Sequence, residues 1–185
     1  MRLLLPLPVP ALTPFREPGH CAAGFLSPTI GLKGGTVEST HLYRTSAIWT
    51  MRRRGIVSAE DVPRTINFSA PPEFQGEPGL WTPEHLLVAS VATCFLATFR
   101  ALAEYSKLQV LRLEVEAEGL LEKEEGGFRF TQIVVRPRLT IAEGADQERA
   151  QRLLEKAERA CLISRSLSSH MELQATVEVG AAVPA

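Results

Sequence analysis

The N-terminal half of the chain opens with short runs in which apolar, β-branched and aromatic residues predict strands. The segment 41–49 has this character, 51–55 indicates a turn, and Ile56 with Val57 begins a return strand. A further short strand is expected at 65–69. The segment 70–79 contains three prolines and two glycines, which are typical of a loop.

A long apolar helix is predicted after this loop. Thr82 is a favourable N-cap, Pro83 suits the first helical position, and the pattern continues to about Lys107. No charged residue lies between Leu86 and Phe99. A helix that is apolar on every side is usually buried on every side. We therefore expect a central helix that is wrapped by sheet or packed against its own copy in a dimer.

A hairpin follows the helix. Apolar and charged residues alternate with a period of two over 111–118, the segment 122–127 is a turn, and 128–141 returns. The apolar positions change parity between Phe130 and Ile133, which predicts a bulge near Thr131. Pro137 predicts an edge strand or a second bulge, because proline cannot donate a ladder hydrogen bond.

A second helix and a last strand complete the pattern. Apolar residues recur at spacings of three and four over 146–160, and this stripe ends at Cys161. Residues 162–169 are expected to form a short segment with one further helical turn, and the pattern of 173–179 predicts a strand. The order of strands, helix, hairpin, helix and strand predicts an α+β fold.

Composition places the chain among globular proteins of one domain. It has 185 residues, 45% of them hydrophobic and 22% charged, with a net charge of −1. The chain therefore lacks the excess of basic residues that is typical of nucleic-acid-binding proteins, and no nucleic-acid partner is expected. We expect no run to approach the roughly 18 apolar residues of a membrane span, so no membrane partner is expected either.

The domain boundaries follow from a change in the sequence pattern near residue 38. Residues 1–37 are rich in proline and read as a poorly ordered N-terminal extension, not as a signal peptide, because three prolines interrupt the first apolar stretch. The domain is expected over 38–180, with a short tail at 181–185. Three widely spaced cysteines form neither a zinc pattern nor a secreted disulfide scaffold, which favours the cytoplasm and no metal or other cofactor. We expect Cys21 to be chemically incidental.

Cys94 and Cys161 are the candidates for chemistry. Each lies on the inward side of a predicted helix, so the two could meet in the core, although buried cysteines often only fill space. A reactive thiol needs a nearby cation. Arg52, Arg53 and Arg54 form the densest cationic cluster, and Glu84 is the natural carboxylate to pair with a buried arginine, unless it only stabilises the first helical turn.

Histidine offers a weaker alternative, a cysteine hydrolase. His85 precedes Cys94 by nine residues on the same predicted helix, about 13 Å along the axis, which is too far for a hydrogen bond within one chain. His41 and His170 cannot be placed from the sequence.

Three segments together resemble the OsmC/Ohr family, the osmotically induced and organic hydroperoxide resistance proteins. Residues 82–95 resemble its Pro-Glu-x-Leu motif with a following cysteine, 160–167 its second cysteine segment, and 49–55 its arginine-bearing turn, in which the spacing favours Arg53. The resemblance covers about residues 39–180. The second cysteine of the family is usually followed by proline, whereas Leu162 follows it here, and Val91 stands where relatives often have another residue type.

The resemblance implies an OsmC-like fold, with curved antiparallel sheets around a long buried helix in an intertwined homodimer. It implies a peroxidase in which Cys94 attacks an organic hydroperoxide and becomes a sulfenic acid, which Cys161 then resolves as a disulfide. Arg53 would activate the thiolate and Glu84 would hold that arginine. The implied reductant is a dithiol, such as a dihydrolipoyl protein, with no metal or flavin.

The substrate pocket and one alternative function remain as expectations. Apolar residues flank the motifs, and we expect a pocket near Cys94 that favours organic over hydrogen peroxide. We expect Phe68, Trp81, Phe95 and Phe99 to line it; Phe74 and Leu80 flank the motifs too. The alternative is an OsmC-like protein that binds or senses a small molecule without turnover.

Overall fold

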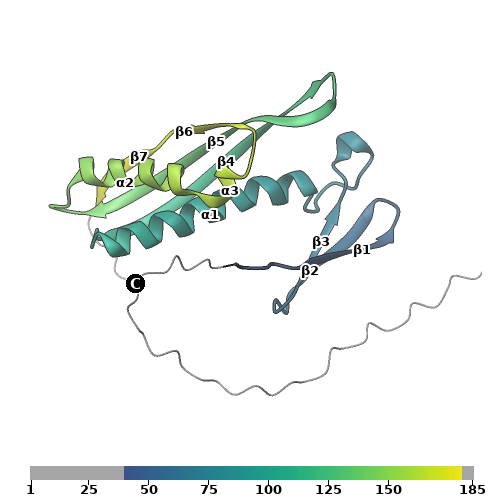
Figure 1. The fold of residues 1–185 in the computed structure, drawn as a ribbon, viewed down its shortest axis with the longest axis horizontal. Helices are drawn as coiled ribbons and strands as arrows, with labels where there is room; N and C mark the ends of the chain where they lie inside the picture. Colours follow the sequence, from purple (N-terminus) through teal and green to yellow (C-terminus); the bar gives the residue numbers. More distant parts are fainter. Residues whose placement is uncertain (1–39, 181–185) are drawn as a thin grey trace, which may run out of the picture. The chain divides into compact units, whose positions relative to one another are not determined.

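A computed structural model describes residues 40–180 of the chain (Figure 1), so the expectations for 1–37, Cys21 and 181–185 lie outside the described residues. The elements in order are β1 (Thr45–Met51), β2 (Arg54–Ala59), β3 (Ile66–Ser69), the short 3₁₀ turn η1 (Pro72–Phe74), α1 (Pro83–Tyr105), β4 (Val110–Glu124), β5 (Gly127–Ala142), α2 (Gln147–Ala160), α3 (Leu162–Arg165), β6 (His170–Leu173) and β7 (Thr176–Gly180). The predicted α+β class is confirmed.

The first sheet is antiparallel with strand order β1-β2-β3. The predicted turn between β1 and β2 is present, and Arg52 enters the left-handed region there with φ of 47°. The indole N–H of Trp49 donates to the Arg52 carbonyl over 2.8 Å, which closes the turn. This turn sets the three arginines at one end of the sheet.

The second sheet is mixed, which corrects the expectation of antiparallel sheets alone. The β4–β5 hairpin is antiparallel, whereas β6 and β7 both run parallel to β5 because the chain crosses over through α2 and α3 before returning. The single strand predicted at 173–179 is therefore two strands. Each pairs with a different part of β5.

Two predictions for the hairpin can be compared with its register. The bulge near Thr131 is confirmed, because Leu120 pairs with Gln132 while Leu121 pairs with Phe130, which leaves Thr131 without an opposing residue. Pro137 lies at a local edge of the sheet and not in a bulge. It falls between the part of β5 paired with β6 and the part paired with β7, so its missing N–H is tolerated where no strand pairs on that side.

The helices cover one face of the second sheet (Figure 1). α1 packs on β4 and on α2, and α2 packs on β5 and β7. Alternate residues of β5 point into the core beneath them, where the side chains of Ile133, Val135, Leu139 and Ile141 are buried. Cys161 is buried in the same core.

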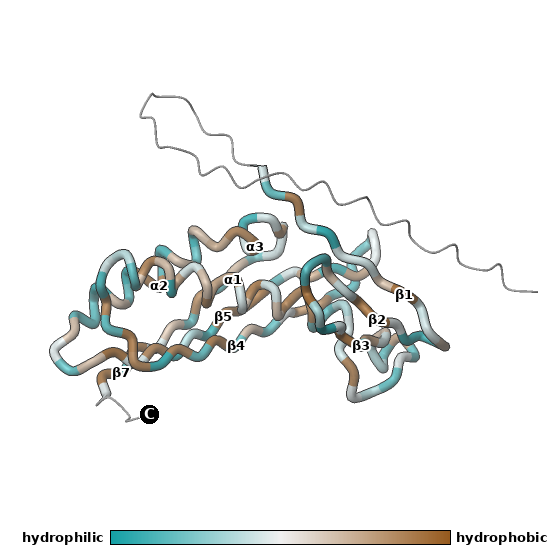
Figure 2. Tube along the Cα trace, turned by 90° about the horizontal axis from the view of Figure 1, so that it is seen from below, coloured by the Kyte–Doolittle hydropathy of each residue, from teal (hydrophilic) through white to brown (hydrophobic). Residues whose placement is uncertain are grey.

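α1 begins as predicted, with the Thr82 hydroxyl accepting a hydrogen bond from the His85 N–H. Its burial differs from the expectation. Within one chain only the face formed by Val91, Phe95, Phe99 and Ala103 is buried. The other residues of α1 are half-buried or exposed. Figure 2 colours the trace by the hydropathy of each residue.

The length of this apolar helix also corrects a second expectation. By its length and hydropathy α1 could span a membrane. This is contrary to the expectation that no apolar run approaches the length of a membrane span. Its buried residues belong to the core formed with the second sheet and α2, which is the packing of a core helix.

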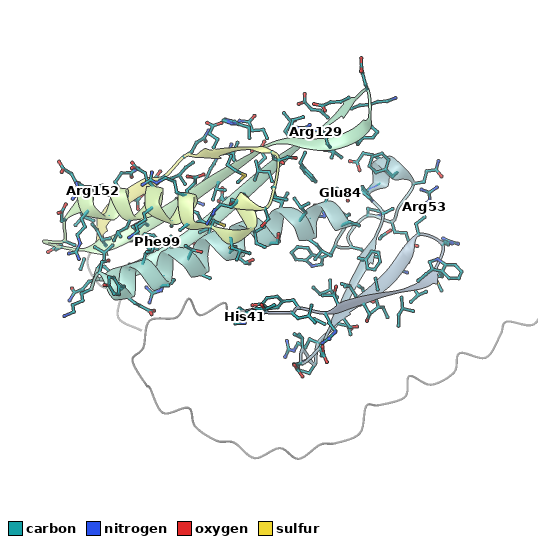
Figure 3. The ribbon with its side chains drawn as sticks, viewed as in Figure 1. His41, Arg53, Glu84, Phe99, Arg129 and Arg152 are labelled. Carbon is teal, nitrogen blue, oxygen red and sulfur yellow. The ribbon has the colours of Figure 1, made fainter. Side chains whose placement is uncertain are left out.

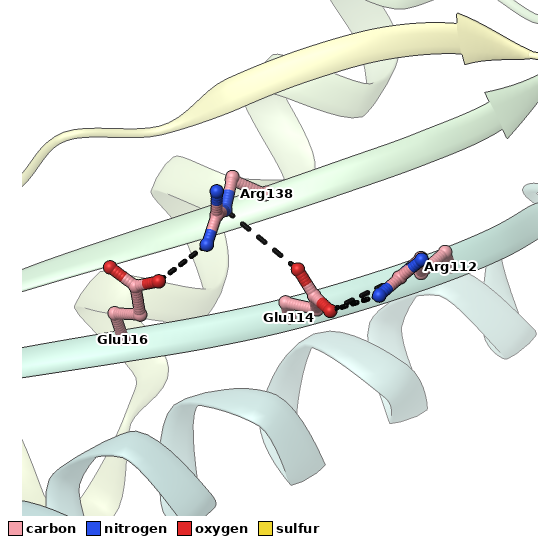
Figure 4. Close-up of polar contacts among 4 residues, drawn as sticks. All are labelled: Arg112, Glu114, Glu116 and Arg138. Atoms are coloured by element: carbon pink, nitrogen blue, oxygen red, sulfur yellow. Dashed lines mark hydrogen bonds and ion pairs between the residues drawn. The ribbon is translucent and has the colours of Figure 1, made fainter.

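The outer face of the second sheet carries paired charges (Figure 4). Glu114 and Arg138 are opposite one another across β4 and β5, and Arg138 also pairs with Glu116. A hydrogen bond and the positive charge of Arg112, with a smaller effect of Arg138, hold the pKa of Glu114 below its usual value. Such exposed pairs contribute little to stability, so we interpret this face as a solvated surface rather than a reaction site.

Candidate active site

The structure brings Cys94 and Cys161 together. Cys94 lies in the middle of α1, and Cys161 occupies the junction between α2 and α3, which pack on α1. The two thiols are within hydrogen-bonding reach of each other, and both are free. Two sulfurs separated by 67 positions in the sequence therefore meet in the folded chain, as their inward positions on two helices indicated.

The surroundings of Cys94 favour its anion. Partial burial raises the pKa of Cys94, but hydrogen bonds from the Ile163 N–H, the Cys161 thiol, the Leu162 N–H and the Thr98 hydroxyl outweigh it, so the pKa lies below its usual value. These hydrogen-bonding groups are all uncharged.

The surroundings of Cys161 act in the opposite direction. Burial raises the pKa of Cys161, hydrogen bonds from Ser164 lower it in part, and the neighbouring Cys94 raises it again, so the pKa lies above its usual value. Cys161 is thus the proton donor of the pair and Cys94 the acceptor. When the environments of two neighbouring groups push their pKa values apart, their chemical roles differ.

The three arginines at the β1–β2 turn have different partners. Arg54 forms an ion pair with Glu77 at 3.4 Å. Arg53 extends over η1, where its guanidinium donates to the Phe74 carbonyl at 2.5 Å and to the Gln75 side chain at 3.0 Å. Arg53 is thus hydrogen-bonded to the η1 loop within one chain, and its guanidinium is not among the groups that hydrogen-bond to Cys94.

Glu84 is placed near the same end of the molecule as Arg53, at the start of α1, whereas Phe99 lies well along the helix (Figure 3). Among residues 40–180, no group hydrogen-bonds to its Oε2, although that atom is buried. A buried carboxylate oxygen without a partner is costly, so this position requires a donor. Glu84 precedes Cys94 by ten residues, which separates them by about 15 Å along α1.

A cavity of about 620 Å³ opens beside Glu84. The η1 turn, the first turns of α1 and the β4–β5 hairpin enclose it. Phe74 and Phe128 close one side through an edge-to-face contact with ring centroids 5.3 Å apart. Its walls are mostly apolar and its charged lining groups are the carboxylates of Glu73 and Glu84, so it suits a mainly apolar ligand.

The four residues that were expected to line a substrate pocket lie elsewhere in the structure. Phe95 and Phe99 are buried in the core, on the face of α1 that meets the second sheet. Phe68 packs against Gly55, where an added Cβ would lie 2.6 Å from its ring. Trp81 is 50% exposed and contacts the His85 ring edge to face. None of the four lines the cavity beside Glu84.

Sequence reasoning missed two parts of this site. Phe128 and Phe130 line the cavity, but the fold of a long hairpin over α1 was needed to bring them there. The backbone amides of Leu162 and Ile163 lower the pKa of Cys94. A backbone donor leaves no signature in residue type, and only the start of a helical turn directly after Cys161 could have indicated it.

Within the part of the chain that the structure describes, there is no cluster of three or more His, Cys, Asp or Glu side chains that could hold a metal ion.

Comparison with known proteins places this chain in a family. A family model described as OsmC-like protein matches residues 76–176. The uncharacterised protein YmaD of Bacillus subtilis is 33% identical over 146 residues, which cover 76% of this chain and 97% of that protein. An organic hydroperoxide resistance protein of Xanthomonas axonopodis pv. citri is 29% identical over 138 residues, 74% of this chain and 94% of that protein.

The fold agrees with this relationship. The structure of an OsmC-like protein of unknown function from Vibrio cholerae superposes with a TM-score of 0.68 at 18% identity, covering 74% of this chain and all of that one. The family match spans more than half of the chain and includes both cysteines of the site. The protein therefore has an OsmC-like α+β fold and belongs to the OsmC/Ohr family.

Proposed function

We propose that this protein is a thiol-dependent peroxidase that reduces organic hydroperoxides. The observation that carries the proposal is the contact between Cys94 and Cys161, two free thiols whose pKa values are displaced in opposite directions. A thiolate is the attacking form of cysteine, and a second thiol beside it can resolve the product once it gives up its proton.

The reaction has two chemical steps in the protein. The Cys94 thiolate attacks the outer oxygen of the hydroperoxide, the O–O bond breaks, and the alkoxide leaves as an alcohol after taking up a proton. Cys94 is oxidised to a sulfenic acid. The Cys161 sulfur then attacks the Cys94 sulfur, water leaves, and a disulfide remains. A dithiol reductant, such as a dihydrolipoyl protein, returns both thiols by exchange.

Arg53 and Glu84 are proposed to complete the site from a second copy of the chain. One guanidinium cannot bridge Glu84 and a Cys94 about 15 Å away on the same straight helix. If two α1 helices pack side by side in opposite directions and are offset by about half their length, the start of one lies beside the middle of the other. Arg53 of one subunit, released from η1 and held by Glu84, then reaches Cys94 of its partner.

The uncovered surface of a single chain supports this homodimer. On α1, Thr93, Leu96, Ala97 and Ala101 are exposed on one side of the helix, at spacings of three and four. On the first sheet, every residue of β1 is exposed, including Trp49 at 72%. Apolar surface of this extent is usually covered by a partner.

The proposed substrate class follows from the relatives and the cavity. The Xanthomonas relative carries the name organic hydroperoxide resistance protein. The apolar cavity beside Glu84 would hold the organic part of such a substrate, at about 0.8 kcal/mol for each buried methylene group. We place the protein in the cytoplasm, where free thiols persist, and propose no metal, cofactor, nucleic-acid or membrane partner for it.

Steady-state reduction of cumene hydroperoxide with a dihydrolipoyl reductant tests the proposal. The Cys94→Ser variant is expected to lose turnover entirely. The Cys161→Ser variant is expected to consume one hydroperoxide per chain rapidly and then stop as a sulfenic acid, which dimedone traps. A wild-type protein that leaves cumene hydroperoxide unchanged would refute the peroxidase.

The same measurement decides the alternative, a small-molecule binding or sensing protein. This alternative has one observation in its favour, since neither cysteine lines the cavity within one chain. It predicts thiols that survive stoichiometric hydroperoxide and a ligand that shifts the melting temperature. The Phe128→Ala variant should bind that ligand with lower affinity.

A further inference from the structure

The two cysteines of the site differ in their exposure to solvent. Cys161 is 0% exposed and belongs to the apolar core, whereas Cys94 is only half-buried and packs against that core. The burial of Cys161 is complete within a single chain. A partner subunit can only cover more surface, so the Cys161 sulfur is closed to solvent in any assembly of this protein.

The backbone holds Cys161 in this buried position. Its N–H donates to the Glu158 carbonyl at 3.2 Å at the end of α2, and its carbonyl accepts from the Arg165 N–H at 3.1 Å at the start of α3. Both helices pack against α1, and α2 also packs against β5 and β7. The sulfur therefore cannot turn outward unless helix ends and part of the core open together, and buried elements open rarely.

Thiol–disulfide exchange requires an open approach to the sulfur that is attacked. The incoming thiolate attacks one sulfur in line with the S–S bond, and the other sulfur leaves. In a bridge between Cys94 and Cys161, attack on Cys161 would have to come through the close-packed core. Attack on Cys94 needs no such opening, because the proposed reaction already requires that a hydroperoxide reach this sulfur.

The leaving groups favour the opposite choice, but their effect is smaller. Attack on Cys161 would expel Cys94, whose pKa lies below its usual value, and a thiol of lower pKa leaves faster. With a slope similar to the roughly 0.5 of the attacking thiol, the rate changes about threefold for each pKa unit. A core sulfur that reacts only through opening is slowed by about two orders of magnitude or more. Access to the sulfur therefore decides which one is attacked.

We propose that the dithiol reductant attacks the disulfide at Cys94 alone and that Cys161 forms no bond with it. The inference rests on the proposed function in taking the bridge between Cys94 and Cys161 as the oxidised form. It adds which sulfur accepts the reductant. The hydroperoxide and the dithiol then use the same opening in turn, and Cys161 acts only from inside the core.

The reduction proceeds in two exchange steps. A thiolate of the dithiol attacks the Cys94 sulfur, the bond between the two cysteines breaks, and its electron pair leaves on Cys161, which takes up a proton. The second thiol of the reductant, as its thiolate, then attacks the reductant sulfur that is bound to Cys94. This step releases the Cys94 thiolate and a cyclic disulfide, so two electrons have passed from the dithiol to the protein.

The first experiment makes the disulfide without any peroxide. Full-length protein carrying Cys21→Ser is oxidised with diamide, exposed briefly to 2-mercaptoethanol, and quenched with N-ethylmaleimide in guanidinium chloride. A monothiol is used because it has no second thiol to release the attacked cysteine. Peptide mass spectrometry should find mercaptoethanol on Cys94 and maleimide on Cys161. Mercaptoethanol on Cys161, or divided equally between the two, would overturn the proposal.

Two single-thiol proteins test the same point without a disulfide, and so decide it even where the mixed disulfide is short-lived. In the Cys21→Ser background, Cys161→Ser leaves Cys94 alone and Cys94→Ser leaves Cys161 alone, so each protein is the matched control of the other. Reaction with dithionitrobenzoate is compared between native and unfolded protein at high pH, where ionisation no longer limits the rate. Folding should slow Cys161 by about a hundredfold or more and Cys94 by far less. Equal slowing of the two thiols would contradict the inference.

Neither measurement uses a hydroperoxide, so its result is independent of turnover. Attack at Cys94 in a protein that leaves cumene hydroperoxide unchanged would refute the peroxidase alone. Attack at Cys161 in an active peroxidase would refute the entry of the reductant at Cys94 alone.

Discussion

A mixing experiment between two inactive variants tests whether the site is built from two subunits. One variant, Cys94→Ser, lacks the attacking thiol but keeps Arg53 and Glu84. The other, Arg53→Ala, keeps both cysteines but lacks the guanidinium. The spacing of about 15 Å between Glu84 and Cys94 along α1 places the two halves of one site on different chains. Mixed dimers should therefore regain activity that neither parent has.

The size of the recovery follows from symmetry. Random pairing of equal amounts gives mixed dimers as half of the population, and each mixed dimer holds one intact site of two. Turnover of cumene hydroperoxide after joint unfolding and refolding should reach about a quarter of the wild-type value. Mixing Cys94→Ser with Cys161→Ser is the control and should recover nothing, because these two thiols meet within one chain. No recovery in the first mixture would refute the shared site.

Three further outcomes follow from the same structure. Ala97→Asp places a charge on the exposed side of α1 and should halve the mass of the protein in light scattering, whereas an unchanged dimer would argue against this interface. Phe99→Ala empties part of the core and should lower the free energy of unfolding by about 3–5 kcal/mol in urea titrations. Because hydrogen bonds favour the anion of Cys94, its alkylation should reach half its maximal rate at a lower pH than that of an unperturbed cysteine, and the midpoint of Cys161 should lie higher.

Local patterns predicted the elements of this fold well. Thr82 caps α1 as predicted, and the parity change in the hairpin marks the bulge at Thr131. Each of these signals lies within a few residues of the feature that it predicts. The partition of the last segment into β6 and β7 depends instead on which part of β5 each one meets, and that long-range choice leaves no local trace.

The candidate site was predictable to the extent that it consists of side chains on helices. The inward positions of Cys94 and Cys161 on two apolar faces sufficed to expect their contact. The cavity was not predictable in the same way. Aromatic residues of its lining come from the β4–β5 hairpin, far along the chain from the motifs. Phe95 was expected in the pocket because it is apolar, but an apolar side chain fits the core equally well, and Phe95 is buried there.

Identification of the disulfide formed by the reduced protein with one equivalent of cumene hydroperoxide tests the central claim most directly. Peptide mass spectrometry should find Cys94 joined to Cys161 within one chain, with loss of two free thiols and release of one equivalent of alcohol. Two thiols that remain free, or a bridge formed only between different chains, would contradict the proposal that these two sulfurs reduce the hydroperoxide together.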